Sequence, residues 1–218
     1  MLRRIGEWPA TVRNFAQEVT THGQRQQRTE KRDEEAEEGQ EVTSVFRLES
    51  ERLFIRAWEP ADRPAYTALT NDAEVTRYVH GGQPFTEAEI DEFFARQARQ
   101  LAEHGVCMGA LCEKATGRIA GIAGTQPLGT TPDFEIGWIL ARDAWGRGYA
   151  TAAGAMAMRH VLETLRHPRV VAIISPDNDP SKRVAERLGM TYEARYTGAQ
   201  LGHRNPGIIV DLFSRHAT

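Results

Sequence analysis

The pattern of apolar and polar residues divides the chain near residue 45. Beyond that point, short apolar runs that alternate with a period of two are interspersed with runs of helical period, which predicts an α/β chain. Strands are expected at residues 53–58, 106–113, 118–126, 134–140, 170–175, 191–196 and 207–213. Helices are expected at residues 60–69, 86–103, 149–165 and 180–188.

Local signals mark where two of these helices begin and end. Thr86 and Glu89 have the spacing of a capping box, and Gly105 follows as a stop signal. Pro180 is expected at the first position of the last helix, and Gly189 at its end. These signals predict two helices with defined boundaries.

Residues 1–44 have a different pattern and are predicted to be an extension, with 45–218 as one domain. Apolar residues recur there at three- and four-residue intervals, which would form one stripe on a helix that Pro9 starts or breaks. Residues 24–41 are almost entirely polar and charged, as in a flexible or solvated helical linker. A docking helix, a membrane-surface helix, a targeting segment and a dispensable extension all fit. The stripe consists of Leu2, Ile5, Trp8, Val12, Phe15 and Val19.

Composition excludes several classes of protein. The 218 residues are 40% hydrophobic and 26% charged, with a net charge of -3, which argues against a general nucleic-acid binder. No apolar run approaches the ~20 residues of a membrane span. Cys107 and Cys112 are predicted on opposite faces of one strand and unable to bridge, and no metal-ligand spacing is present. We therefore expect a soluble cytoplasmic protein without a metal.

The most informative segment is a strand, a glycine-containing turn and a helix over residues 134–165. Gly146 and Gly148 permit a backbone whose N–H groups converge, and the first N–H groups of the following helix lack intrahelical partners. Arg142 and Arg147 are candidates for charge-assisted bonds to an anion held there. This arrangement predicts a diphosphate site, although the two glycines alone are equally consistent with a plain turn.

Other nucleotide-binding motifs fit this segment less well. The Rossmann fingerprint G-x-G-x-x-G/A would need a small residue where Thr151 stands, and no acidic residue follows at the ribose-binding distance. The chain contains no G-x-x-x-x-G-K-S/T string, which excludes a P-loop.

Three motifs stand in order along the chain: SERLFIRAWEP at residues 50–60, WGRGYATAA at residues 145–153 and NDPSKRVAERLGM at residues 178–190. Together they resemble the GNAT superfamily of N-acetyltransferases, in its RimJ/RimL-like branch. Residues 145–153, WGRGYATAA, resemble the acetyl-CoA pyrophosphate loop in its W-G-x-G-Y-A-T-x-A form. Residues 178–190 resemble the segment N-x-x-S-x-x-V-x-E-x-L-G-F/M, and residues 50–60 resemble the first strand. The resemblance covers the chain from Leu48 to its C-terminus and implies a mixed, mostly antiparallel, splayed sheet flanked by helices.

The resemblance also implies acetyl-CoA as co-substrate. Its pantetheine arm is expected to pair with the strand backbone at the split in the sheet and to contact Asn178, and Trp138 is a candidate wall of the acyl pocket. Asp143 departs from the family's Q/R-x-x-G-x-G/A signature, and an acid beside a diphosphate is unfavourable unless its side chain turns away. The candidate binding residues are Ile136, Trp138, Ile139, Leu140, Arg142, Trp145, Gly146, Arg147, Gly148, Tyr149, Ala150 and Asn178.

Two residues are candidates for proton transfer. Glu135 is the only carboxylate within an apolar strand, where partial burial would raise its pKa toward the range of a general base, although a structural ion pair is an equal alternative. Ser181 occupies the position where the resembling branch places a hydroxyl near the thiol sulfur, so it could protonate the leaving thiolate; it could also be a simple first-turn residue. Tyr192 lies too late in the chain to match the tyrosine acid of other superfamily members.

The predicted function is acetyl transfer from acetyl-CoA to a primary amine in a ternary complex, with a protein or peptide N-terminus as the preferred acceptor. A small amine, such as an amino acid, polyamine or antibiotic, is one alternative, and a non-catalytic CoA-binding module is another. Homodimer formation is left open, because similar proteins often dimerise. Trp58, Tyr78, His80 and the segment 196–206 are candidate acceptor-lining residues, each also compatible with an ordinary surface role.

Overall fold

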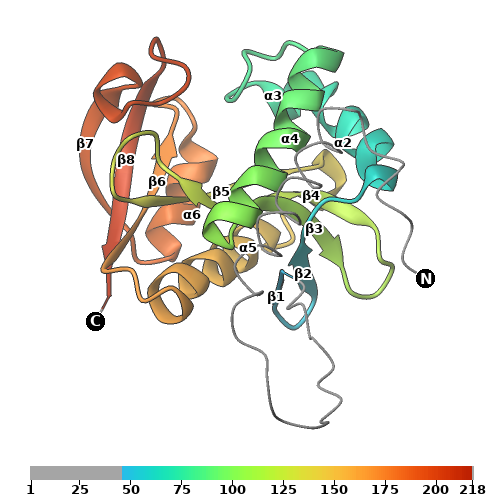
Figure 1. Cartoon of the computed structure of the whole chain (residues 1–218), viewed down its shortest axis with the longest axis horizontal. Coiled ribbons are helices and arrows are strands. Elements are labelled where there is room, and N and C mark those ends of the chain that lie inside the picture. The colour runs from blue at the N-terminus through green and yellow to red at the C-terminus, as the bar shows by residue number, and fades with distance from the viewer. Residues whose placement is uncertain (1–45, 218) are drawn as a thin grey trace, which may run out of the picture. The chain divides into compact units, whose positions relative to one another are not determined.

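The computed structural model describes residues 46–217, which form a mixed α/β domain around one sheet (Figure 1). Its eight strands lie in the order β1-β2-β3-β4-β5-β6-β8-β7, and all neighbours are antiparallel except β5 and β6. The strands are β1 (Arg47–Glu49), β2 (Leu53–Arg56), β3 (Met108–Glu113), β4 (Ile119–Pro127), β5 (Phe134–Leu140), β6 (Arg169–Ile174), β7 (Thr191–Thr197) and β8 (Ile209–His216). The predicted mostly antiparallel sheet is confirmed.

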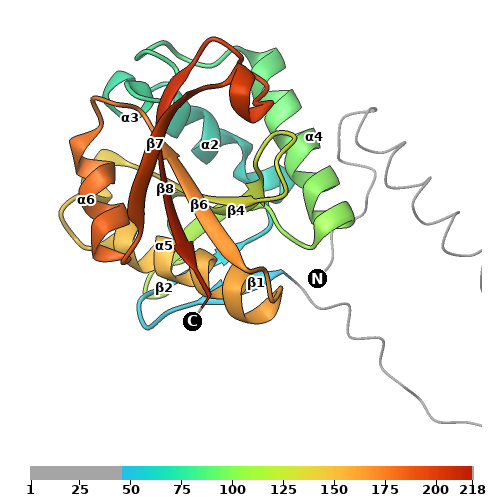
Figure 2. The ribbon, with the colours of Figure 1, turned by 90° about the vertical axis from the view of Figure 1, so that its left-hand side faces the viewer.

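Helices cover both faces of the sheet (Figure 2). One face carries α2 (Arg63–Thr70), α3 (Ala73–Thr76) and α4 (Glu87–His104); the other carries α5 (Tyr149–Arg159) and α6 (Asp179–Arg187). Shorter helical turns are η2 (Pro60–Asp62), η3 (Arg142–Ala144), the π-helical η4 (His160–Thr164) and η5 (Ala199–Leu201).

Most predicted boundaries agree with the structure to within two residues. The capping box of α4 is present, with Thr86 as N-cap, and Gly105 ends the helix in the left-handed conformation. Pro180 lies one position later in its helix than predicted, because α6 begins at Asp179. The short elements β1 and α3 were not predicted. The helix expected within residues 1–44 and the linker at 24–41 lie outside the described residues.

The sheet divides at its single parallel pair. β5 and β6 are in register at only two positions, Phe134 with Val170 and Glu135 with Val171. β5 pairs with β4 along its whole length, from Phe134 to Leu140. Beyond Glu135, therefore, the edge of β5 that faces β6 has no strand partner within residues 46–217, as the sequence resemblance implied.

An aromatic cluster anchors the helices of the first face. Trp58, Tyr66, Phe93 and Phe94 pack with ring centroids 4.4 to 5.9 Å apart, and the indole Nε1 of Trp58 donates to the carbonyl of Met108 at 2.7 Å. Such edge-to-face and stacked contacts favour a fixed arrangement of the rings. Trp58 is only 6% exposed, so it is a core residue of this cluster and not the surface residue that was the alternative; its role in lining the acceptor site stays a prediction.

Small residues let α5 approach the opposite face of the sheet. Ala153 and Ala157 are fully buried, and a Cβ on Gly154 would lie 2.6 Å from Leu188 Cδ1 and 3.1 Å from Trp138 Cζ3. The helix axis therefore packs closely on β5 and α6, which fixes the direction in which its N-terminus points.

Two sequence predictions outside the site can also be compared with residues 46–217. Cys107 and Cys112 are buried and free, as expected. Within these residues, none of the helices combines the length and apolar character needed to cross a bilayer.

Candidate active site

The glycine turn leads into α5 with an open backbone. Gly146 and Gly148 have φ of +72° and +76°, and Gly148 is the N-cap of α5 without any side-chain oxygen to cap it. A Cβ added to Gly146 would have no atom within 4 Å, and one added to Gly148 would approach only the guanidinium of Arg52. The first N–H groups of α5, from Tyr149 and Ala150 onward, thus lie at the positive end of the helix dipole, the arrangement that binds phosphates.

The charged side chains of this loop are bound to partners in the structure. Arg142 Nε donates to Asp72 Oδ2 at 2.6 Å, and Arg147 Nη1 donates to Glu113 Oε1 at 2.7 Å. The carboxylate of Asp143 turns toward Arg118, at 2.6 Å, and so satisfies the condition expected for an acid at this position.

Glu113, at the end of β3, binds several residues around the glycine turn. The sequence did not reveal this role. Its Oε1 accepts bonds from Arg147, from Arg118 at 3.2 Å and from the Tyr149 hydroxyl at 3.1 Å, and its Oε2 accepts from Thr116 at 3.1 Å. Hydrogen bonds from Arg118 first, and then from Thr116 and Tyr149, hold its pKa at about 2, below the usual 4.5. Glu113 therefore connects the middle of the glycine turn and the first residue of α5 to the sheet.

Glu135 lies where β5 and β6 separate. It is 8% exposed, on the α4 face of the sheet. The side-chain amide of Gln126, the residue of β4 that pairs with Glu135, donates to its Oε1. Its Oε2 is buried without a hydrogen-bond partner in the described part of the chain. Burial raises the pKa of Glu135 to about 7, although Gln126, Arg204 and Arg96 act in the opposite direction. A carboxyl with this pKa can accept a proton near neutrality.

The side chains of Ser181 and Trp138 meet on the opposite face of the sheet. The indole Nε1 of Trp138 donates to Ser181 Oγ at 3.3 Å, which leaves the hydroxyl proton free to be donated elsewhere. Asn178 Oδ1 accepts from the backbone N–H of Ser181 at 3.2 Å, so Asn178 is the N-cap of α6. Trp138 also packs into the core beside α5.

The remaining candidate cofactor residues follow the alternation of β5. Ile136 and Leu140 pack on the α5 side and Ile139 on the α4 side, which leaves their backbone as the part that can bind a ligand. Trp145 is 48% exposed, and its indole Nε1 donates to the carbonyl of Leu140 at 2.9 Å. Tyr192, 51% exposed, packs against Phe213 on β7 and β8.

The candidate acceptor residues come from two connections. His80, between α3 and α4, contacts Gln83 and Glu89 through its two ring nitrogens and stacks on Phe85. Tyr78, in the same connection, is half-buried. The segment 196–206 packs through buried Leu201 against the β4–β5 connection, where Thr130 N–H donates to the carbonyl of Leu201.

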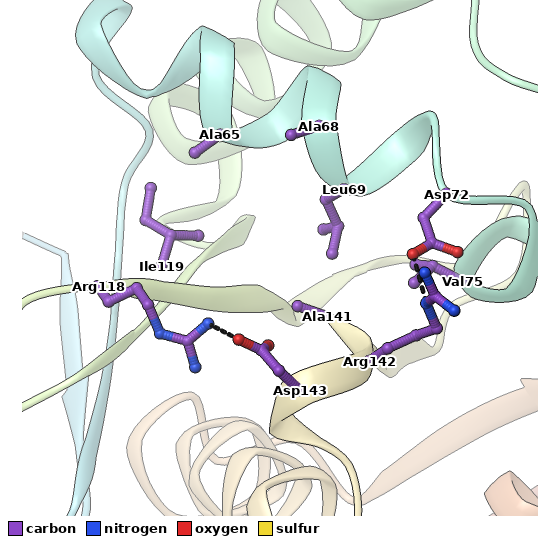
Figure 3. A pocket seen from close by; sticks show the side chains of 10 residues that line it. All are labelled: Ala65, Ala68, Leu69, Asp72, Val75, Arg118, Ile119, Ala141, Arg142 and Asp143. Carbon is purple, nitrogen blue, oxygen red and sulfur yellow. Dashed lines mark hydrogen bonds and ion pairs between the residues drawn. The ribbon is translucent and has the colours of Figure 1, made fainter.

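A separate hollow of about 290 Å³ lies between α2, α3 and the start of the glycine turn (Figure 3). Leu69, Ile119 and Ala141 supply apolar walls, and the Arg118–Asp143 and Asp72–Arg142 ion pairs lie across its rim. Both pairs include a residue of η3, so the hollow borders the glycine turn. It lies apart from Glu135 and contains none of the proton-transfer candidates.

Comparison with known proteins identifies the family. The domain family described as "Acetyltransferase (GNAT) domain" matches residues 52–191. This chain belongs to the GNAT acetyltransferase family. It is accordingly an acetyl-CoA-dependent acetyltransferase. Among curated relatives from Bacillus subtilis, the uncharacterized protein YkkB is 30% identical over 69% of this chain and 88% of its own length. The uncharacterized N-acetyltransferase YnaD is 27% identical over 67% and 83%.

Solved structures share the fold. An acetyltransferase from Agrobacterium tumefaciens has a TM-score of 0.67 and 25% identity, over 86% of this chain and 99% of that one. RimL, a ribosomal alpha-N-protein acetyltransferase solved in complex with coenzyme A, has a TM-score of 0.64 and 21% identity, over 78% and 98%.

The Glu113 contacts predict a specific loss of acid stability. A carboxyl whose pKa falls from 4.5 to about 2 on folding stabilises the native state above pH 4.5, and that contribution is lost as the pH falls toward 2. Glu113→Gln should therefore flatten the decline in unfolding free energy across this window, measured by urea denaturation. Glu51→Gln, at an exposed glutamate, is the control and should retain the decline. Equal declines in wild type and Glu113→Gln would contradict the assigned contacts.

Proposed function

We propose that this acetyltransferase transfers the acetyl group of acetyl-CoA directly to a primary amine at the N-terminus of a peptide or protein. The observation that carries the proposal is the position of Glu135. Its buried carboxyl, with a pKa of about 7, lies at the last residue of β5 that pairs with β6. A proton acceptor is thus placed where the sheet begins to open.

The residues around the opening fit a CoA ester. The unpaired edge of β5 from Ile136 to Leu140 offers backbone N–H and C=O groups to the pantetheine amides, in the manner of an added strand. The open turn at Gly146 and Gly148 and the N-terminus of α5 would hold the diphosphate. Arg142 and Arg147 would add charge by exchanging their present carboxylate partners for phosphate oxygens. Bound acetyl-CoA supplies the activated thioester.

Glu135 is the proposed base. An α-amino group has a pKa of about 8, so at neutral pH most of the acceptor is protonated and must lose a proton before attack. The free Oε2 of Glu135 accepts that proton, directly or through one water. The neutral nitrogen then forms the C–N bond to the acetyl carbonyl carbon.

Ser181 is the proposed acid. Its oxygen already accepts from the Trp138 indole, so its own proton is available for the sulfur as the C–S bond breaks. The nitrogen loses its second proton to solvent, solvent reprotonates Ser181, and Glu135 releases the proton that it took up. The products are the N-acetyl amide, free CoA thiol and one proton. Asn178 orients the first turn of α6 and so places this hydroxyl.

The preference for a peptide or protein N-terminus is supported by the names of relatives. YdaF of Bacillus subtilis, 26% identical over 67% of this chain, is described as a putative ribosomal N-acetyltransferase. The RimL structure is described as a ribosomal alpha-N-protein acetyltransferase. A screen for CoA thiol release with peptide mixtures and with small amines tests this acceptor class, and turnover of small amines alone would overturn it.

Substitution of Gly146 should weaken acetyl-CoA binding specifically. Gly146 and Gly117 share a φ of +72°, and a Cβ added to either would have no atom within 4 Å. Valine at either position imposes similar backbone strain, on the order of 1–3 kcal/mol. Gly146→Val should raise the calorimetric Kd for acetyl-CoA by about tenfold or more, because the loop amides lose their alignment. Gly117→Val, in the β3–β4 turn, should leave Kd unchanged. Equal Kd values for the two variants would place the phosphates elsewhere.

The pKa of Glu135 predicts the pH dependence of turnover. The rate should rise with pH through about 7, because only the ionised carboxylate accepts a proton. Glu135→Gln should lower kcat by about 10² to 10⁴-fold and abolish that inflection. Since folding raises this pKa above 4.5, wild type should also lose stability as the pH rises from 4.5 through about 7, and Glu135→Gln should not. A variant with the wild-type rate profile would exclude Glu135 as base.

The hydroxyl of Ser181 is expected to act on kcat. Ser181→Ala should lower kcat by about tenfold to a hundredfold, with little change in the KM for acetyl-CoA, because the leaving thiolate loses its proton donor. Ser181→Thr, which retains a hydroxyl, is the matched control and should recover part of the rate. Stopped-flow measurement of thiol release tests both variants. Full activity of Ser181→Ala would assign Ser181 a structural role in α6.

A further inference from the structure

Arg52 connects the turn between β1 and β2 to the glycine turn. Its Nη2 donates to the backbone carbonyl of Arg147 at 3.0 Å, across 95 positions of the chain. The backbone carbonyl of Arg52 accepts from the N–H of Lys114 at 2.9 Å, so Arg52 is itself attached to the β3–β4 turn. The side chain therefore reaches the glycine turn from a fixed backbone position.

The guanidinium of Arg52 lies beside the N-terminus of α5. It is 5.2 Å from the centroid of the Tyr149 ring, and a Cβ added to Gly148 would lie 3.8 Å from its Nη2. The acids around the glycine turn are bonded to other arginines, and Arg52 forms no ion pair within residues 46–217. A guanidinium carries a permanent positive charge in proteins. Its hydrogen bond to Arg147 is thus charge-assisted.

This hydrogen bond fixes the direction of one peptide group. The carbonyl of Arg147 and the N–H of Gly148 belong to the same planar trans peptide, so they point in opposite directions. Because Arg52 holds the carbonyl, the N–H of Gly148 points away from Arg52. Within residues 46–217 this N–H donates to no backbone carbonyl. It is therefore available to an anion bound at the start of α5.

The glycine at position 148 makes an external support for this peptide necessary. Glycine adopts φ of either sign at little steric cost, so the peptide that precedes Gly148 can rotate and exchange the directions of its carbonyl and N–H. In the rotated form a carbonyl oxygen would face the anion and repel it. With Arg52 bonded to the carbonyl, Gly148 has φ of +76°. A cationic donor on the carbonyl also polarises the peptide and strengthens its N–H as a donor.

We propose that Arg52 is a positioning residue for the diphosphate of acetyl-CoA, and that it acts by holding the peptide between Arg147 and Gly148 with its N–H toward the phosphates. The inference rests on the proposed diphosphate site at the glycine turn. Arg52 acts on the binding of the phosphates, not on the reaction at the thioester.

Two thioesters test this role. Acetyl-CoA carries the diphosphate, whereas S-acetylpantetheine has the same thioester and amides without a phosphate. Arg52→Met should raise the calorimetric Kd for acetyl-CoA by about tenfold or more, since a charge-assisted hydrogen bond contributes on this scale. The KM for acetyl-CoA should rise in parallel, with little change in kcat. The Kd for S-acetylpantetheine, measured by ligand-observed NMR, should stay at the wild-type value.

Two further variants control for charge and for donor chemistry. Arg52→Lys retains a cationic donor and should recover part of the affinity for acetyl-CoA. Arg159→Met removes an exposed arginine from the last turn of α5, at the other end of the same helix, and should keep the wild-type Kd. An unchanged Kd for acetyl-CoA in Arg52→Met, or an equal rise for both thioesters, would overturn the inference.

NMR of protein labelled at glycine nitrogen distinguishes positioning from simple charge attraction. At saturating CoA, the amide proton of Gly148 should shift downfield in wild type, because it donates to a phosphate oxygen, and much less in Arg52→Met. The full wild-type shift in Arg52→Met would mean that Arg52 attracts the phosphates only by its charge, and its positioning role would then be refuted.

The Gly146→Val variant separates failure of this inference from failure of the proposed function. Weaker acetyl-CoA binding in Gly146→Val, with wild-type binding in Arg52→Met, would leave the diphosphate site in place and refute only the role of Arg52. Wild-type binding in both variants would place the diphosphate elsewhere and overturn both proposals.

Discussion

The short contact between β5 and β6 decides which part of β5 is free to bind a ligand and where Glu135 lies. Only two residue pairs join these parallel strands, and the strands then separate while each keeps an antiparallel neighbour. Backbone groups at a sheet edge need partners, so a ligand with amide groups can take the place of the missing strand. Glu135 is the last residue of β5 that pairs with β6, and under the proposed function the acceptor and the CoA ester meet there.

Two glutamates show how the surroundings decide the role of one side chain. Glu113 receives bonds from two arginines, a tyrosine and a threonine, and these donors stabilise its ionised form. The carboxyl of Glu135 receives a single hydrogen bond within residues 46–217, from a neutral amide, and its burial favours the protonated form. The first is therefore a permanent anion that supports the glycine turn, whereas the second can exchange a proton near neutrality.

Most charged side chains around the glycine turn are paired within the protein. Arg142 and Arg147 each have a carboxylate partner, and Asp143 is neutralised by Arg118. Arg52 differs, because its guanidinium donates to the carbonyl of Arg147 at 3.0 Å and forms no ion pair within residues 46–217. The positive potential at this site therefore comes from the N–H groups of the turn, the dipole of α5 and Arg52.

Local signals in the sequence determined seven of the eight strands, the capping box at Thr86, the glycine turn and the presence of one carboxylate inside an apolar strand. These features depend on residues close together in the chain, where backbone preference and side-chain period decide the outcome. Only the tertiary structure showed that Trp58 is buried, that Glu113 contacts the turn and that Glu135 lies where β5 and β6 separate. These contacts join residues far apart in sequence, and they depend on how the helices and the β7–β8 connection pack around the sheet, which no local pattern specifies.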